Sequence, residues 1–176
     1  MKRFLMYIVG TSGSGKTTIA SALEKKIREE SNIELQFIDG DVIREEFGGI
    51  FGYTYEERMR GNKCVCVVCN YLLKHNVSVI LAQVGAYEKM RNQVKSVCPD
   101  DYIEVYVKCS YEECAKRDVK GYYKKAKLGE MDNLNGTNDS FETPTDSAIV
   151  IDTEKTSVAE AVDIIFSYLI EKGFLS

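Results

Sequence analysis

A glycine-rich stretch near the start of the chain has the residue types and the spacing that bind phosphate. Residues 10–17 read Gly-Thr-Ser-Gly-Ser-Gly-Lys-Thr, which fits the pattern of glycine, four residues and then Gly-Lys-Thr. Glycines let such a loop curl until several backbone N–H groups meet one phosphate. Lys16 then reaches the β- and γ-phosphates, and the Thr17 hydroxyl is placed for Mg²⁺. The predicted ATP-binding residues here are Gly10, Ser12, Gly13, Ser14, Gly15, Lys16, Thr17 and Thr18.

Two carboxylates follow the next apolar stretch. Residues 35–38 are typical of a short strand, which ends in Asp39-Gly40-Asp41. Ligands bind at the carboxyl ends of strands in α/β sheets, so these acids are expected beside the phosphate loop. Carboxylates in that place can hold Mg²⁺ or accept a proton as a general base. Taken alone, the pattern would also suit a turn with solvated aspartates.

A third segment is rich in lysine and tyrosine. It spans about 116–136 and contains Lys116, Arg117, Lys120, Tyr122, Tyr123, Lys124, Lys125 and Lys127. Such a charge run is most often a solvated helix face. Because the segment follows a strand that ends on the side of the phosphate loop, it is here interpreted as a small basic lid. A lid over a triphosphate would exclude water and stabilise the transferring charge.

Strands and helices alternate along the chain. Strands are expected at 4–9, 35–38, 77–84, 102–107 and 148–151, and helices after the loop, at 55–75, 87–97, from 111 and at 157–172. This order predicts an α/β, three-layer P-loop NTPase fold with a five-stranded parallel sheet and a small lid segment. Two of these helices are predicted to have an apolar face. In the helix at 55–75 it is composed of Val65, Val67, Val68, Tyr71 and Leu72, and in the helix at 157–172 of Val158, Val162, Ile165, Phe166 and Leu169.

The composition is that of an ordinary globular protein. The chain has 176 residues, 44% hydrophobic and 28% charged, so residues 1–176 are predicted to form one domain. No apolar run could span a bilayer and no signal peptide is recognised, so the expected location is cytoplasmic, without membrane contact. A net charge of −4 favours no nucleic-acid partner. Cys64, Cys66 and Cys69 are interpreted as core residues rather than a metal site.

Several blocks together resemble the adenylylsulfate kinases, which move the ATP γ-phosphate to the 3′-hydroxyl of adenosine 5′-phosphosulfate. The resemblance runs from about residue 5 to residue 165. The matching blocks are residues 10–18, Ile-Asp-Gly-Asp-Val-Ile-Arg at 38–44, Phe-Gly-Tyr-Thr at 51–54 with Glu57-Arg58 following, Ile-Glu-Val-Tyr-Val at 103–107, Arg117-Asp118, Lys-Gly-Tyr-Tyr-Lys-Lys-Ala-Lys-Leu-Gly-Glu at 120–130 and Ile-Asp-Thr at 151–153. The first block is generic to P-loop proteins, whereas the lid block is quite specific.

The resemblance implies a role for single residues. Asp41 matches the base for the attacking hydroxyl, Asp39 a metal-linked acid, and Lys120 a lid lysine that contacts both substrates. The implied catalytic residues are therefore Asp41, Lys16 and Lys120, and the implied metal ligands Thr17 and Asp39. The other implied positions are Arg117 and Thr156 for the ATP adenine, and Arg44, Tyr53, Arg58, Val84 and Leu134 for the acceptor.

The sequence departs from the family pattern on the acceptor side. Gly61 stands for an asparagine, Lys63 and Cys64 for paired arginines, and Leu134 for a stacking aromatic. Val84-Gly85-Ala86-Tyr87 replaces Ile-Ser-Pro-Tyr, Glu88 follows where many members carry arginine, and Arg91 is kept. Lysine does not replace the bidentate contacts of a guanidinium.

Three functions stay open at this point. The first is adenylylsulfate kinase activity with ATP and Mg²⁺, and the second is the same chemistry on another nucleotide, such as the cytidine diphosphoramidate of capsule modification. The third is a nucleotide-binding module without phosphotransfer, although a binding module would not require a base such as Asp41. The resemblance also suggests a homodimer.

Overall fold

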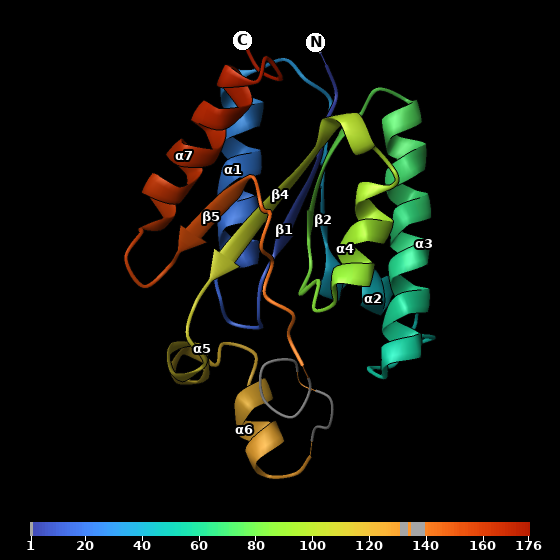
Figure 1. Ribbon diagram of the computed structural model, residues 1–176, viewed down its shortest axis with the longest axis vertical. Helices are drawn as coiled ribbons and strands as arrows, with labels where there is room; N and C mark the ends of the chain where they lie inside the picture. The colour runs from blue at the N-terminus through green and yellow to red at the C-terminus, as the bar shows by residue number, and fades with distance from the viewer. Residues whose placement is uncertain (1, 131–133, 135–139) are drawn as a thin grey trace.

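A computed structural model of the protein describes residues 2–130, 134 and 140–176. In these ranges a parallel sheet lies between two layers of helices (Figure 1). Its strands are β1 (Leu5–Val9), β2 (Leu35–Asp39), β3 (Ser78–Ala82), β4 (Tyr102–Lys108) and β5 (Ile149–Asp152). Their order is β2-β3-β1-β4-β5, so the first strand lies in the middle of the sheet. The predicted α/β, three-layer fold with five parallel strands is confirmed.

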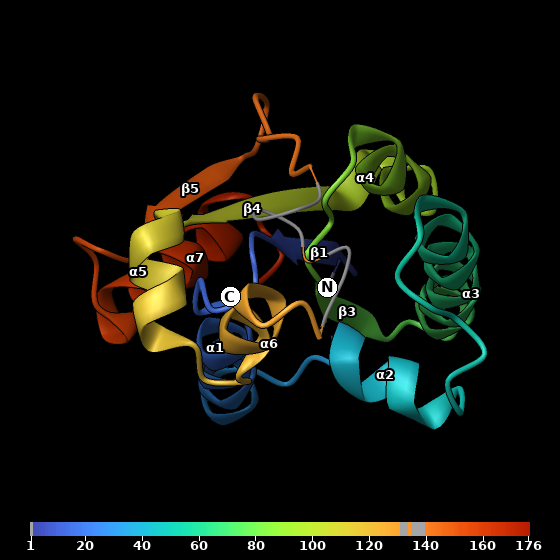
Figure 2. The same ribbon diagram turned by 90° about the horizontal axis from the view of Figure 1, so that it is seen from below.

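Helices cover both faces of this sheet. One face packs against α1 (Lys16–Glu30) and α7 (Val158–Glu171), with Ile19, Leu23 and Ile27 fully buried or nearly so. The other face packs against α3 (Tyr55–Lys74) and α4 (Glu88–Lys95), as the view from below makes clear (Figure 2). Both faces are covered, which is why every residue of β1 and β3 is buried and neither strand alternates between apolar and polar residues.

The remaining helical segments lie at the ends of the sheet. Near the carboxyl ends of the strands are α2 (Gly40–Glu46), α5 (Tyr111–Arg117) and α6 (Tyr122–Lys127), whereas a 3₁₀ turn over Pro99–Asp101 precedes β4. The helix α2, which follows the Asp39-Gly40-Asp41 turn, is not among the helices that the sequence predicts. Asp39 caps this helix with its side chain, which accepts from Asp41 N at 2.8 Å.

Two of the expected apolar faces need correction. In α3, Val67 and Tyr71 are 55% and 61% exposed, and the buried positions are Arg58, Asn62, Val65, Cys69 and Leu73. Residues 58, 62, 65, 69 and 73 therefore form the inward face of α3, and its first two members are polar. Val158 is also exposed, because it is the first residue of α7 and lies beyond the sheet-facing stripe.

Other expectations on cysteine and on membranes can be compared with the described residues. Cys69 is buried in the core, and Cys64 and Cys66 are partly buried. Among the described residues, no group of three or more His, Cys, Asp or Glu side chains could hold a metal ion. The described helices include none that is long and apolar enough to cross a bilayer.

Candidate active site

A cavity of about 300 Å³ opens at the carboxyl ends of β1, β2 and β3. Most of the predicted site residues line it: Ser12, Gly13, Gly15, Lys16, Thr17, Thr18, Asp39, Asp41, Arg44, Tyr53, Arg58, Val84, Lys120 and Leu134. They come from segments up to 122 residues apart in the sequence (Ser12 to Leu134). Of the predicted residues, Gly10, Ser14, Arg117 and Thr156 do not line the cavity.

Lys16 lies at the start of α1, on the floor of the phosphate loop. Its Nζ donates to the Thr11 carbonyl oxygen at 2.7 Å, and the side chain is only slightly exposed. Burial lowers the pKa of Lys16 from its usual 10.5 to about 8, and the charge of Lys120 acts in the same direction. Asp41 and Asp39 oppose this shift. A triphosphate beside Nζ would oppose it much more strongly, so the loop is prepared for an anion.

Thr17 and Asp39 form a pair of oxygen groups next to Lys16. The Thr17 hydroxyl donates to Asp39 Oδ2 at 2.7 Å, while Asp39 Oδ1 accepts from Asp41 N. A carboxylate and a hydroxyl are hard oxygen donors of the type that Mg²⁺ takes, and Mg²⁺ usually keeps waters and substrate phosphates in its other positions. These two residues therefore fit the predicted metal site.

Asp41 and Lys120 face each other across the cavity mouth. Lys120 Nζ contacts Asp41 Oδ2 in an ion pair between side chains that are each about half exposed. Burial alone would lower the pKa of Lys120, but its hydrogen bond and charge interaction with Asp41, helped by Asp39, raise it above the usual value. Lys120 is thus a permanent cation, and its pairing keeps the lid against α2.

The lid is tied to the phosphate loop by a second contact. The buried Tyr123 hydroxyl donates to Ser12 O at 2.8 Å, and Asp118 caps α6 by accepting from Tyr123 N and Lys124 N at 3.0 Å. Lys124, Lys125 and Lys127 are exposed, so among the described lid lysines Lys120 is the one that lines the cavity. Of the predicted lid at 116–136, residues 131–133 and 135–136 lie outside the described residues.

Two arginines flank Tyr53 on the opposite side of the cavity. Arg44 Nη1 donates to Phe51 O at 2.9 Å and to Gly52 O at 2.7 Å, and Arg58 Nε donates to Tyr53 O at 2.8 Å. Their Cζ atoms lie 4.8 and 5.4 Å from the centre of the Tyr53 ring. These contacts hold two positive charges beside one aromatic face, which suits an acceptor with an anionic group and a flat ring.

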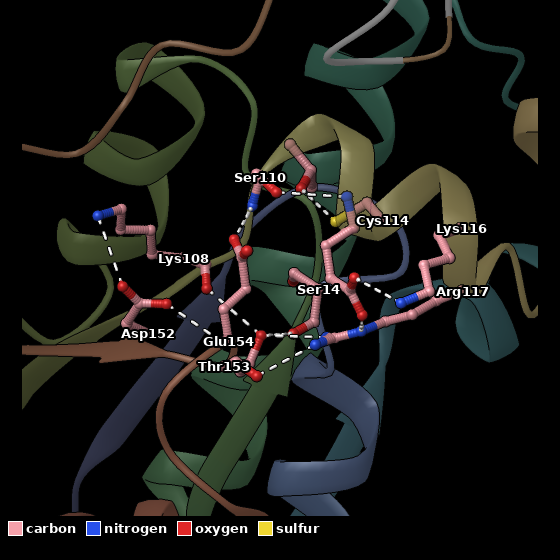
Figure 3. A network of polar contacts seen from close by, with 11 residues as sticks. Ser14, Lys108, Ser110, Cys114, Lys116, Arg117, Asp152, Thr153 and Glu154 are labelled. Carbon is pink, nitrogen blue, oxygen red and sulfur yellow. Dashed lines mark hydrogen bonds and ion pairs between the residues drawn. The ribbon is translucent and has the colours of Figure 1, made fainter.

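Arg117 does not line the cavity, and its guanidinium group lies against Thr153, the residue after β5 (Figure 3). Its Nη1 and Nη2 donate to Thr153 Oγ1 and Thr153 O, both at 3.1 Å, and its Nε donates to Glu113. Thr153 in turn donates to Ser14 O at 3.0 Å, so it joins Arg117 to the phosphate loop. Thr156 N bonds to Asp152 O. The predicted contact of Arg117 and Thr156 with an adenine stays a prediction.

Of the positions that depart from the family pattern, Gly85 and Leu134 line the cavity, whereas Gly61, Lys63, Cys64 and Glu88 do not. Phe51 fills the space at Gly61, where an added Cβ would be 3.3 Å from the ring. Lys63 and Glu88 are exposed. Arg91, the arginine that is kept, is buried and does not line the cavity, because Nη1 donates to Gly85 O at 2.8 Å and Nε lies 3.9 Å from Glu104.

Sequence reasoning missed several residues at the cavity. Gln83, Tyr122, Met90 and Val119 line it, and Thr153 connects it to Arg117. Gln83 could have been found, since it is a single polar residue directly after the apolar β3, at the carboxyl end of a strand. Thr153 belongs to the matching block at 151–153, but the sequence did not indicate its contacts, because they are made with residues far away in the sequence.

Comparisons with known proteins show the family to which this chain is similar. Residues 2–152 match the protein family described as adenylylsulphate kinase. The adenylyl-sulfate kinase of Oceanobacillus iheyensis is 35% identical over 99% of this chain and 87% of its own length. That of Halothermothrix orenii is 33% identical over 99% of this chain and 94% of its own length. The solved structure of the Mycobacterium tuberculosis APS kinase CysC in complex with AMPPNP and APS shares the fold with a TM-score of 0.88, at 24% identity over 96% of this chain and 98% of that one.

Proposed function

The chain belongs to the adenylylsulphate kinase family, and from this premise we propose that it phosphorylates the 3′-hydroxyl of adenosine 5′-phosphosulfate with ATP. The products would be ADP and 3′-phosphoadenylyl sulfate. One observation carries the proposal most directly: a single cavity holds a phosphate loop with Lys16 and, across from it, the carboxylate of Asp41. A donor phosphate and an acceptor hydroxyl could meet between them.

The transfer is an in-line displacement at the γ-phosphorus. The 3′-oxygen of the acceptor forms a bond to phosphorus, the bond to the bridging oxygen breaks, and ADP leaves with the electron pair. The proton of the attacking hydroxyl passes to Asp41. Lys16 and Lys120 stabilise the negative charge on the phosphoryl oxygens, since one lies on the loop and the other on the lid.

The Asp41–Lys120 ion pair implies an order of events in this mechanism, in which ATP binds before Asp41 acts as the base. While Lys120 is bonded to Asp41 Oδ2, this oxygen is occupied by the ammonium group and is not free to accept the proton of a hydroxyl. An incoming triphosphate offers Lys120 a stronger anionic partner, so Lys120 can turn toward it and release Asp41. The base would then become fully available only when ATP is bound, which limits wasteful chemistry without the donor.

Thr17 and Asp39 would hold Mg²⁺ in this scheme. Their fit to that ion rests on the hard oxygen donors described above and on their place beside Lys16. When bound, Mg²⁺ would neutralise charge on the β- and γ-phosphates. The acceptor would lie on the other side, with its ring against Tyr53 and its anionic group near Arg44 and Arg58.

A second acceptor is favoured by the departures on that side. Leu134 supplies a smaller surface than an aromatic ring, and Arg91 is bonded to Gly85 O and does not itself line the cavity. A smaller base with fewer charge contacts, as in cytidine diphosphoramidate, would suit such a site. The chemistry and the donor would be unchanged.

An acceptor comparison tests the proposed function. Purified protein receives ATP, Mg²⁺ and either adenosine 5′-phosphosulfate, cytidine diphosphoramidate or no acceptor, and ADP release is followed. We expect release to depend on adenosine 5′-phosphosulfate. Release with the cytidine nucleotide alone would support the second acceptor, and release that no nucleotide stimulates would contradict phosphotransfer.

Family membership also supports a homodimer in the cytoplasm, where both nucleotides are available. Light scattering coupled to size-exclusion chromatography would test the dimer. A mass of about 40 kDa is expected, twice the 19.9 kDa of one chain, and a mass of one chain at micromolar concentration would contradict it.

A further inference from the structure

Gln83 has a placement in the cavity that no predicted role explains. It follows β3 directly, lines the cavity and is half-buried. Its backbone N–H donates to Ile8 O, which anchors it to the central strand β1. A polar side chain at this depth, at the carboxyl end of a strand, is well placed to contact a ligand.

The carboxamide of Gln83 is held in one orientation. The Tyr7 hydroxyl donates to Oε1 at 3.2 Å. Tyr7 is fully buried, and burial raises the pKa of its hydroxyl well above the usual range, so the group keeps its proton and acts as a donor. Because Oε1 is taken, Nε2 is left with two N–H groups, and it has no hydrogen-bond partner among the described residues.

Two glycines make room for this arrangement. At Gly40 an added Cβ would lie 2.3 Å from Gln83 Cγ and 3.1 Å from Nε2, so the Gln83 side chain passes directly under the Gly40 backbone. At Gly85, where φ is +57°, an added Cβ would lie 3.1 Å from the Tyr7 hydroxyl. Gly85 is the residue that replaces the serine of the family pattern, and it keeps space around the Tyr7–Gln83 contact.

The position of Gly40 also indicates which part of a bound substrate lies beside Gln83. It lies between Asp39 and Asp41, and strand pairing puts Asp39 beside Ala82, the residue before Gln83. In the proposed function, the attacked 3′-hydroxyl lies at the Asp41 carboxylate. The group next to it is the sugar, whereas the base would lie farther out, against Tyr53 and Leu134.

We propose that Gln83 is a specificity-determining residue whose Nε2 donates a hydrogen bond to the 2′-oxygen of the acceptor ribose. The proposal rests on the proposed function. It makes the enzyme selective for a ribonucleotide acceptor and assigns Tyr7 a positioning role, because the Tyr7 hydroxyl keeps Nε2 directed into the cavity. Losing one such hydrogen bond lowers kcat/KM by roughly tenfold.

A comparison of two acceptors with two enzymes tests this contact. The acceptors are adenosine 5′-phosphosulfate and its 2′-deoxy analogue, and the enzymes are the wild type and Gln83→Leu. We expect Gln83→Leu to lower kcat/KM about tenfold for the ribonucleotide and less than twofold for the deoxynucleotide, with the KM for ATP unchanged. Equal losses for both acceptors, or no loss for either, would overturn the proposal.

Further variants separate binding from folding. Gln83→Met is close in size to the wild type but has no N–H to donate, so it should lose the same selectivity. Tyr7→Phe should reduce selectivity to a lesser degree and leave ATP binding unchanged. Gln36→Leu, on the exposed side of β2, is the matched control, and its kinetics should equal those of the wild type. A selective Gln83→Met enzyme would contradict the donor role.

The two levels of the proposal can fail separately. If the wild type turns over neither acceptor, the proposed function is wrong. Calorimetric titration of both nucleotides into wild type and Gln83→Leu then tests Gln83 without catalysis. Tighter binding of the ribonucleotide in the wild type only would support the Gln83 contact, and equal affinities in all four titrations would refute it.

Discussion

ATP affinity should fall as the pH rises through about 8, because Lys16 then loses its proton. Burial lowers the pKa of Lys16 from 10.5 to about 8 in the free enzyme. The phosphates of bound ATP add negative charge beside Nζ and raise this pKa again. Binding therefore requires the protonated lysine, and its favourable contribution is present below pH 8 and is lost above it.

The size of the effect follows from the pKa. With a pKa of about 8, roughly nine-tenths of Lys16 is protonated at pH 7 and roughly one-tenth at pH 9. The Kd for ATP should thus increase about tenfold between these values. Lys120 does not add to this change, since its pKa is raised above the usual value and it keeps its proton. The titration of ATP itself adds little to this change in Kd, because a phosphate monoester loses its second proton at about pH 6.

Calorimetric titration of ATP, without an acceptor, measures the effect directly. Buffers with different ionisation enthalpies report how many protons are taken up, and about half a proton per ATP is expected at pH 8. Lys16→Arg is the matched variant, because a guanidinium stays protonated. Its affinity is expected to be lower, but its Kd should change less than twofold from pH 7 to pH 9. A wild-type Kd that is constant over this range, without proton uptake, would refute the reasoning.

Three further predictions concern the base, the metal pair and the fold. Asp41→Asn should lower kcat by about 100-fold or more while the Kd for ATP changes little, as steady-state kinetics and calorimetry would measure; a variant with full kcat would exclude Asp41 as the base. Asp39→Asn can still cap α2 but loses a charge, so half-maximal activity should need more Mg²⁺ than in the wild type; an unchanged Mg²⁺ titration would count against the metal role. Gly85→Ala should reduce the free energy of unfolding in urea by about 1–3 kcal/mol, because φ is +57° and the new Cβ would lie 2.6 Å from Val9 Cγ1; wild-type stability would show that the segment can shift.

Much of the fold was predictable because its signals are local. The apolar runs of β1 and β3 and the glycine-rich loop before α1 depend on residues close together in the sequence. The errors occur where the signal is ambiguous. Val67 and Tyr71 are apolar but exposed, whereas Arg58 and Asn62 are polar but buried, so a hydrophobic pattern alone misjudged the face of α3.

The residues of the candidate site that belong to short sequence motifs were predictable. Lys16, Thr17, Asp39 and Asp41 come from short patterns, and all four line the cavity. Contacts between distant segments carry no such pattern. The bonds from Arg117 to Thr153, from Thr153 to Ser14 and from Tyr7 to Gln83 each depend on the sheet order, which brings β1 beside β3 and β4 beside β5.

The position of the transferred phosphate tests the central claim most directly. The protein is incubated with Mg²⁺, adenosine 5′-phosphosulfate and ATP labelled in the γ-phosphate, and the nucleotide product is isolated and treated with a 3′-nucleotidase. We predict that one labelled phosphate enters the acceptor for each ADP formed and that the nucleotidase releases all of it. Label that stays out of the acceptor, or that resists the nucleotidase, would contradict transfer to the 3′-hydroxyl.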